Sequence, residues 1–169
     1  LRLAMDVSDS VNVYAGVSTG YKATSWNLTR NAYPDFAIRG QLAAAGLLQT
    51  NQRYGQRFAL PEEATVLEVG MKARFDRGSV NLAIFDQNIE NFQSNVFLGT
   101  GFALANAGKQ SVKGAEVDIV YYPTDALQLT FAATYLDPLY DDFANAGANP
   151  FTGATVDLSG ETPAGISEL

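Results

Sequence analysis

The chain has 169 residues and a formal net charge of −7, and it contains neither cysteine nor histidine. The absence of cysteine excludes disulfides and thiolate metal sites, and the absence of histidine removes the commonest general base and metal ligand. The acidic balance argues against nucleic acid as a partner, because phosphates are bound by clustered Lys and Arg. The composition therefore disfavours an enzyme, and it predicts no metal site and no cofactor.

Six segments alternate apolar and polar side chains, which is the period of β-strands with one apolar and one polar face. In the third segment, for example, Leu67 and Val69 flank Glu68. The six predicted strands are residues 1–7, 11–22, 65–75, 79–91, 110–122 and 127–137. Several of them reach the roughly 9–11 residues that cross a bilayer at a tilt, whereas strands of soluble sheets usually stop at about 5–6. We therefore expect strands that span a membrane.

The links between these strands alternate between short and long. Tight turns are predicted at Ser8-Asp9-Ser10, Asp76-Arg77-Gly78 and Pro123-Thr124-Asp125, and long connections at residues 23–64, 92–109 and 138–169. Every long connection therefore leaves the same edge of the sheet, an arrangement typical of an outer-membrane β-barrel wall. The predicted fold class is all-β: an antiparallel up-and-down meander of about six strands that forms a section of a transmembrane β-barrel wall.

Charged side chains follow the polar faces of the predicted strands. A Lys or Arg side chain that faced lipid near the bilayer midplane would destabilise the barrel by about 2–4 kcal/mol. These charged rows must therefore face a water-filled lumen or other protein. Six strands are too few to enclose a lumen, because small barrels need about eight. The chain also begins without an initiator methionine and stops inside a predicted loop. We interpret residues 1–169 as a partial β-barrel domain, a fragment without a plug domain and the remaining strands.

The first long connection, residues 23–64, is too long to be a simple link, and loops of this length usually carry function. It gathers arginine and aromatic side chains that would suit an anionic or ring-bearing ligand. The candidate ligand-binding residues are Trp26, Arg30, Tyr33 and Arg39. The alternative is a loop that only caps the pore. Within it, the Ala- and Leu-rich residues 41–49 predict a short helix.

Several short motifs occur in a fixed order along the chain. They are Gly20-Tyr21-Lys22, Pro61-Glu62-Glu63, Asn106-Ala107-Gly108, Lys113-Gly114-Ala115-Glu116 and Tyr122-Pro123-Thr124-Asp125. Together they resemble the C-terminal β-barrel of TonB-dependent outer-membrane receptors, and the match covers most of the chain. The pairing of Asn-Ala-Gly with Lys-Gly-x-Glu is the most specific of them. Thr24-Ser25-Trp26 replaces the glycine-rich continuation common in that family, which leaves the ligand class open.

The resemblance implies a location in the bacterial outer membrane and the active uptake of a scarce ligand, such as a siderophore-iron chelate, a corrinoid or an oligosaccharide. The implied partners are outer-membrane lipid, the remaining barrel strands and plug domain, the TonB complex through a missing N-terminal region, and the small-molecule ligand. Two alternatives stay open: a passive porin or adhesin barrel, and a soluble β-sheet binding module. A plug-sized domain upstream favours the receptor, whereas a chain that stays monodisperse without detergent favours the module.

Overall fold

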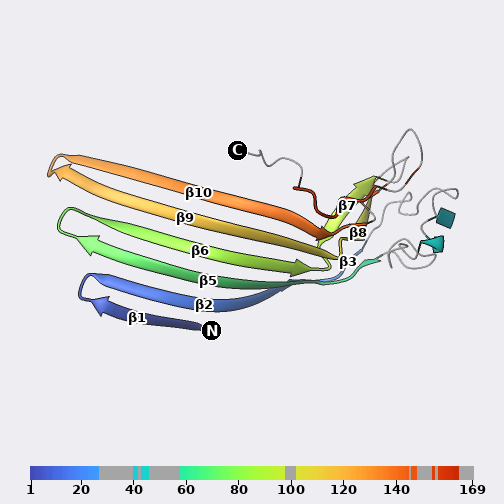
Figure 1. Ribbon diagram of the computed structural model, residues 1–169, viewed down its shortest axis with the longest axis horizontal. Helices are drawn as coiled ribbons and strands as arrows, with labels where there is room; N and C mark the ends of the chain where they lie inside the picture. Colours follow the sequence, from blue (N-terminus) through green and yellow to red (C-terminus); the bar gives the residue numbers. More distant parts are fainter. Residues whose placement is uncertain are drawn as a thin grey trace. The chain divides into compact units, whose positions relative to one another are not determined.

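The computed structural model describes residues 1–26, 40–41, 43–45, 58–97, 102–144, 146–147, 154 and 156–163. Its main element is a six-stranded meander with the strand order β1-β2-β5-β6-β9-β10 (Figure 1). The strands are β1 (Arg2–Ser8), β2 (Val11–Lys22), β5 (Glu62–Phe75), β6 (Gly78–Glu90), β9 (Lys109–Thr124) and β10 (Leu127–Asp142). The predicted all-β meander is confirmed. β1 and β10 stand at the two ends of the strand order, so the sheet is open.

Two differences from the predicted strand boundaries have a physical reason. The connections 23–64 and 92–109 contain two short ladders, β3 (Ser25–Trp26) with β4 (Phe58–Ala59) and β7 (Gln93–Phe97) with β8 (Phe102–Asn106). Such short strands carry too little alternation to be recognised. In addition, β10 continues through Pro138 instead of ending before it.

Pro138 is tolerated in β10 because of the direction in which its nitrogen points. Tyr140 lies two residues after Pro138, so the backbone nitrogens of the two residues point to the same side of the strand. The N–H of Tyr140 donates to the carbonyl oxygen of Glu161 at 3.0 Å, and not to β9. The missing N–H of Pro138 therefore also faces away from β9, and no hydrogen bond of that ladder is lost.

The chain divides into two compact units, which we describe separately. The first unit comprises Leu1–Thr19, Thr65–Asn88 and Val112–Pro138, and the second comprises Gly20–Ala64, Ile89–Ser111 and Leu139–Leu169. The first unit thus contains the sheet segments next to the three tight turns. The second contains the strand ends from which the long connections emerge.

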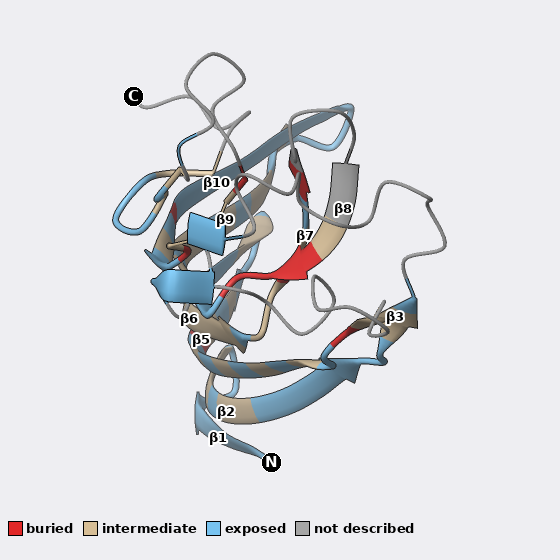
Figure 2. Cartoon of the chain, turned by 90° about the vertical axis from the view of Figure 1, so that its right-hand side faces the viewer, coloured by how far each residue is buried: buried red, intermediate tan, exposed pale blue. Residues whose placement is uncertain are grey.

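The apolar face of the first unit is uncovered. Leu3 is 70 % exposed, Ile84 62 %, Phe131 57 % and Leu67 55 %. Figure 2 shows β1 and β10 exposed along almost their whole length. Soluble proteins rarely leave so much contiguous apolar surface in water. Within the described residues, the structure therefore excludes a dry two-layer core around Leu67, which a soluble sandwich would require.

The second unit has a small core of its own. Val96, Ala105, Ala107 and Phe143 are each at most 3 % exposed, and partly buried apolar side chains pack against them. The segment 156–161 runs beside the end of β10, where the N–H of Leu158 donates to Phe143 at 3.1 Å. This segment closes one side of the core.

Helical structure is limited in the described part of the chain. Gly40, Gln41, Ala43 and Ala44 are helical, and the N–H of Ala45 donates to the carbonyl oxygen of Gln41 at 3.0 Å. Gln41, Ala43 and Ala44 fall within the predicted helix 41–49 and Gly40 precedes it, whereas residues 42 and 46–49 lie outside the described ones. No helix among the described residues is long and apolar enough to cross a membrane.

Candidate functional site

On the polar face of the first unit, Tyr14 connects β1, β2 and β5. The guanidinium of Arg2 lies over its ring at 3.9 Å from the centroid, a cation–π contact. The ring itself covers Gly70, where any Cβ atom would collide with it. The Tyr14 hydroxyl interacts with the carboxylate of Glu68. A single aromatic side chain therefore fixes the spacing of three strands and the position of one carboxylate.

Next to Tyr14, the polar face contains a cavity of about 170 Å³. Its polar lining comes from four strands and consists of Tyr14, Lys72, Asn81, Glu116 and Asp118. Two carboxylates, an ammonium, an amide and a phenol provide both donors and acceptors. This confirms the predicted row of ionised groups, and such a surface suits contact with another polar protein surface.

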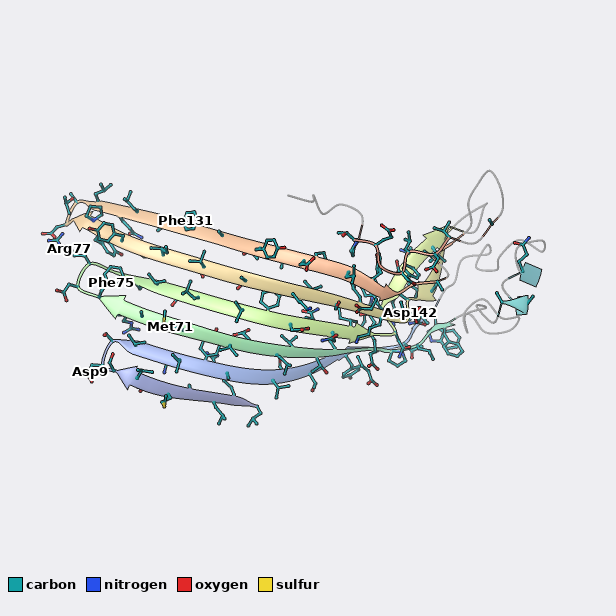
Figure 3. The ribbon with its side chains drawn as sticks, in the orientation of Figure 1. Asp9, Met71, Phe75, Arg77, Phe131 and Asp142 are labelled. Carbon is teal, nitrogen blue, oxygen red and sulfur yellow. The ribbon has the colours of Figure 1, made fainter. Side chains whose placement is uncertain are left out.

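At the turn side of the same unit, Arg77 connects two hairpins. Figure 3 shows Arg77 and Phe75 at the turn that joins β5 to β6. The Arg77 guanidinium donates to the carbonyl oxygens of Tyr122 at 3.4 Å and Pro123 at 3.1 Å. It also lies 3.8 Å from the carboxylate of Asp125, which is fully exposed. Arg77 thus joins the turn of the second hairpin to the end of β9, where Pro123 and Thr124, which were predicted as turn residues, continue the strand.

In the second unit, the buried amide of Asn106 binds the chain that returns from the first long connection. Asn106 is 4 % exposed. Its Oδ1 accepts from the N–H of Leu60 at 2.8 Å, and its Nδ2 donates to the carbonyl oxygens of Leu60 at 3.1 Å and Asn91 at 2.6 Å. The amide therefore pairs with both backbone groups of Leu60, as a neighbouring strand would. Asn91 adopts a left-handed φ of 54°, which asparagine tolerates better than most residues.

Gln93, which is 6 % exposed, binds residues at both ends of the first long connection. Its Nε2 donates to the carbonyl oxygens of Ala23 at 3.0 Å and Leu60 at 2.9 Å, and its Oε1 accepts from the hydroxyl of Ser25 at 2.7 Å. Its backbone N–H donates to Glu62 Oε1 at 2.6 Å. We call Gln93 and Asn106 the amide latch.

The pairing of Asn106-Ala107-Gly108 with Lys113-Gly114-Ala115-Glu116, the most specific sequence motif, has a structural explanation. Asn106 belongs to the amide latch, and Ala107 is completely buried in the core. Gly108 lies beneath the side chain of Asp142, and in the first unit Gly114 lies beneath the ring of Phe85; a Cβ at either glycine would collide with its neighbour. Each position of Asn-Ala-Gly, and the glycine of Lys-Gly-x-Glu, is thus set by a cross-strand contact.

Of the four predicted ligand-binding residues, the structure describes Trp26. It lies in β3, is 66 % exposed, and its ring centroid is 5.7 Å from that of Phe58 in β4, with the ring planes inclined by 53°. We call Trp26 and Phe58 the aromatic pair. Arg30, Tyr33 and Arg39 lie outside the described residues.

The sequence did not predict that Phe58 pairs with Trp26, or that Gln93 binds Ser25 beside Trp26 and Glu62 accepts from Gln93. Phe58 is one of the aromatic residues that the sequence gathers in the connection 23–64, but nothing local indicates that it pairs with Trp26. Among the described residues, no group of three or more carboxylate, histidine or cysteine side chains is placed to hold a metal ion.

The chain was compared with known families and proteins. A family model described as "TonB dependent receptor-like, beta-barrel" matches residues 2–168. The chain belongs to this family. The predicted resemblance is thereby confirmed, and TonB-dependent receptors are transporters rather than enzymes. No curated protein matches the chain.

Solved structures show the same fold. The ferric yersiniabactin uptake receptor FyuA from Yersinia pestis aligns with a TM-score of 0.59 at 16 % identity, over 82 % of this chain and 18 % of its own. The ferric preacinetobactin receptor BauA from Acinetobacter baumannii has a TM-score of 0.54 at 17 % identity, over 84 % and 18 %. The copper transporter OprC has a TM-score of 0.64 at 15 % identity, over 86 % and 21 %. The TonB-dependent receptor barrel described here thus spans about a fifth of each relative.

Proposed function

We propose that this chain is a wall section of an outer-membrane transporter that takes up a ferric siderophore with energy from the TonB system. The observation that carries the proposal is the family match over residues 2–168. Two of the similar structures are named as receptors for ferric siderophores, which favours this ligand class over a corrinoid or an oligosaccharide. The remaining wall strands, the plug domain and the contact with TonB belong to the proposal.

The two faces of the sheet would have different partners. The apolar face would contact outer-membrane lipid, and it contains a shallow depression of about 790 Å³ lined largely by apolar side chains such as Leu3, Leu67 and Ile84. The polar face, with Lys72, Glu116 and the cavity beside Tyr14, would contact a plug domain inside the lumen. The cost of placing charges in hydrocarbon supports this orientation over its reverse.

Ligand capture is assigned to the aromatic pair together with Arg30, Tyr33 and Arg39. Exposed aromatic rings and guanidinium groups are suited to a ferric chelate that carries rings and negative charge. The exposed ring of Trp26 beside Phe58 supports a role for this part of the first long connection.

Transport assays on the full-length receptor test the proposed function. Uptake of ferric enterobactin, ferric yersiniabactin and cyanocobalamin would be measured in cells that express the receptor, with and without a functional TonB. We expect uptake of at least one ferric chelate, and we expect it to stop without TonB. Uptake that continues at the same rate without TonB would support the passive porin and overturn the proposal.

A substitution tests the role of Trp26. Trp26→Ala should weaken binding of the transported ferric chelate by about tenfold, the equivalent of one aromatic contact worth about 1.4 kcal/mol. Tyr21→Ala is the matched control, because Tyr21 is an 80 % exposed ring that follows the apolar face of β2. Equal affinities of the wild type and both variants would remove Trp26 from the capture surface.

A further inference from the structure

The aromatic pair stands on a very small ladder. β3 and β4 contribute two residues each, paired as Ser25 with Ala59 and Trp26 with Phe58. A two-stranded ribbon is marginally stable in water even when it is longer. The orientation of the two rings therefore depends on contacts outside β3 and β4.

The amide latch provides contacts to both strands of this ladder. On the β3 side, Gln93 binds the hydroxyl of Ser25 and the carbonyl oxygen of Ala23. On the β4 side, Gln93 and Asn106 together bind both backbone groups of Leu60, which follows directly after β4. Each bound residue is a close chain neighbour of one of the two rings. Both latch residues, however, belong to the strands of the second long connection.

The two amide groups of the latch are also fully hydrogen-bonded and almost completely buried from solvent. The amide oxygen of each side chain accepts one hydrogen bond, and each amide nitrogen donates two. Buried polar networks hold one arrangement when every group is paired, because any other arrangement leaves buried groups unsatisfied. A nearby ion pair reinforces the same junction, since Lys22 lies 3.1 Å from the Glu62 carboxylate that accepts from Gln93.

We infer that Gln93 and Asn106 are positioning residues for ligand capture: from the second long connection, they hold the aromatic pair of the first in its binding orientation. The first and second connections then act as one binding element. Because coupling between sites is reciprocal, a ligand bound at the aromatic pair also stabilises the latch. The ligand-dependent part of this inference rests on the proposed function, whereas the positioning of Trp26 does not.

Fluorine NMR of the full-length receptor in detergent, labelled with fluorotryptophan, tests the positioning without any ligand. The Trp26 resonance is identified by its absence in Trp26→Phe. Gln93→Met and Asn106→Leu keep similar side-chain volumes but remove the amides, and each should shift the Trp26 resonance and change its line width. Gln128→Met, the same change at an exposed position of β10, should leave it unchanged. An unchanged Trp26 resonance in both latch variants would overturn the inference.

A milder variant covers the case in which a latch substitution prevents folding. Ser25→Ala removes only the hydroxyl that donates to Gln93 and leaves both buried amides in place. It should move the Trp26 resonance in the same direction by a smaller amount. If Ser25→Ala leaves the resonance unchanged while both latch variants fail to fold, the amides are structural and the inference fails.

A double-mutant cycle separates positioning from a general structural role. Gln93→Met should weaken binding of ferric enterobactin by about fivefold in the otherwise unchanged receptor. In a receptor that already carries Trp26→Ala, the same substitution should have no further effect, because its influence passes through Trp26. An equal loss in both backgrounds would contradict the inference. If the receptor binds neither ferric enterobactin nor ferric yersiniabactin, the proposed ligand class is wrong, and the NMR experiment still decides the positioning.

Discussion

The ring of Tyr14 lies over the bare backbone of Gly70, so that β2 and β5 touch on the polar face through an aromatic ring and a glycine. Any Cβ at position 70 would meet ring atoms of Tyr14, which also makes a cation–π contact with Arg2. This contact sets how closely the two strands and their polar side chains can approach.

Gly70→Ala should therefore destabilise the receptor by about 1–3 kcal/mol, since the added methyl group forces the ring out of its position. Urea unfolding of the full-length receptor in detergent measures the change. Gly20→Ala is the matched control, because a Cβ at Gly20 meets no atom within 4 Å. Equal midpoints for the two variants would show that the Tyr14 ring moves aside at no cost.

Arg77 should stabilise the turn region through hydrogen bonds rather than through its ion pair. Arg77→Ala removes two donations to backbone carbonyl oxygens, and we expect a loss of about 0.5–1 kcal/mol. Asp125→Ala removes only a fully exposed partner and should have no measurable effect, as is usual for exposed ion pairs. Urea midpoints of the two variants in detergent make the comparison. A larger effect for Asp125→Ala would reverse the assignment.

The two faces of β6 should respond differently to the same new charge. Ile84 lies in the middle of the strand on the apolar face and is 62 % exposed, whereas Asn81 belongs to the polar face. Ile84→Lys should cost about 2–4 kcal/mol in a lipid-embedded barrel, and Asn81→Lys should be nearly neutral. Folding titrations of the full-length receptor in lipid vesicles provide the measurement. Similar costs at both positions would contradict the lipid contact of the apolar face.

The third long connection should lose stability when the Asp157 carboxylate is protonated at low pH. Hydrogen bonds from Ser159 hold the pKa of Asp157 below its ordinary value of 3.8. Because the folded pKa is the lower one, the carboxylate stabilises this segment at pH values above 3.8, and the contribution is lost as the pH falls through the folded value.

Ser159→Ala should raise the pKa of Asp157 toward its ordinary value, and carboxyl-carbon NMR of the full-length receptor measures the midpoint. The rise should be partial, because the backbone N–H of residue 159 still donates at 2.9 Å. Asp157→Asn identifies the resonance. A midpoint that does not move in Ser159→Ala would remove the hydroxyl as a cause of the lowered pKa.

The sequence is sufficient to predict the strands of the barrel wall. It is not sufficient to predict the contacts between strands that are distant in the sequence. Alternation along residues 65–75 and the turn residues after Phe75 are local signals, and they predict the strands, their faces and their order. The reasons for Gly70, Gly108 and Gly114 are not local, because each lies beneath a side chain from another strand. The motifs that contain Gly108 and Gly114 were recognisable by resemblance, but the contacts behind all three glycines became visible only in the folded chain.

In the candidate site too, the sequence predicts a residue from local signals but not its partners from distant parts of the chain. Trp26 was predicted from the length and composition of its connection, and the structure describes it as an exposed ring. Its partner Phe58 lies at the far end of that connection, and the latch residue Gln93 lies in the next one. Pairings across such distances in the chain depend on how the connections fold back, which a periodic pattern does not encode. Arg30, Tyr33 and Arg39 remain predictions.

Among the described residues, the buried core of the second unit is limited to Val96, Ala105, Ala107 and Phe143, and the unit is joined by buried amides. Unfolding it would expose little apolar area, so the associated change in heat capacity should be small. Warming and cooling around room temperature should therefore alter the opening of this region only slightly. Urea, which solvates peptide groups directly, should loosen it more effectively than temperature does.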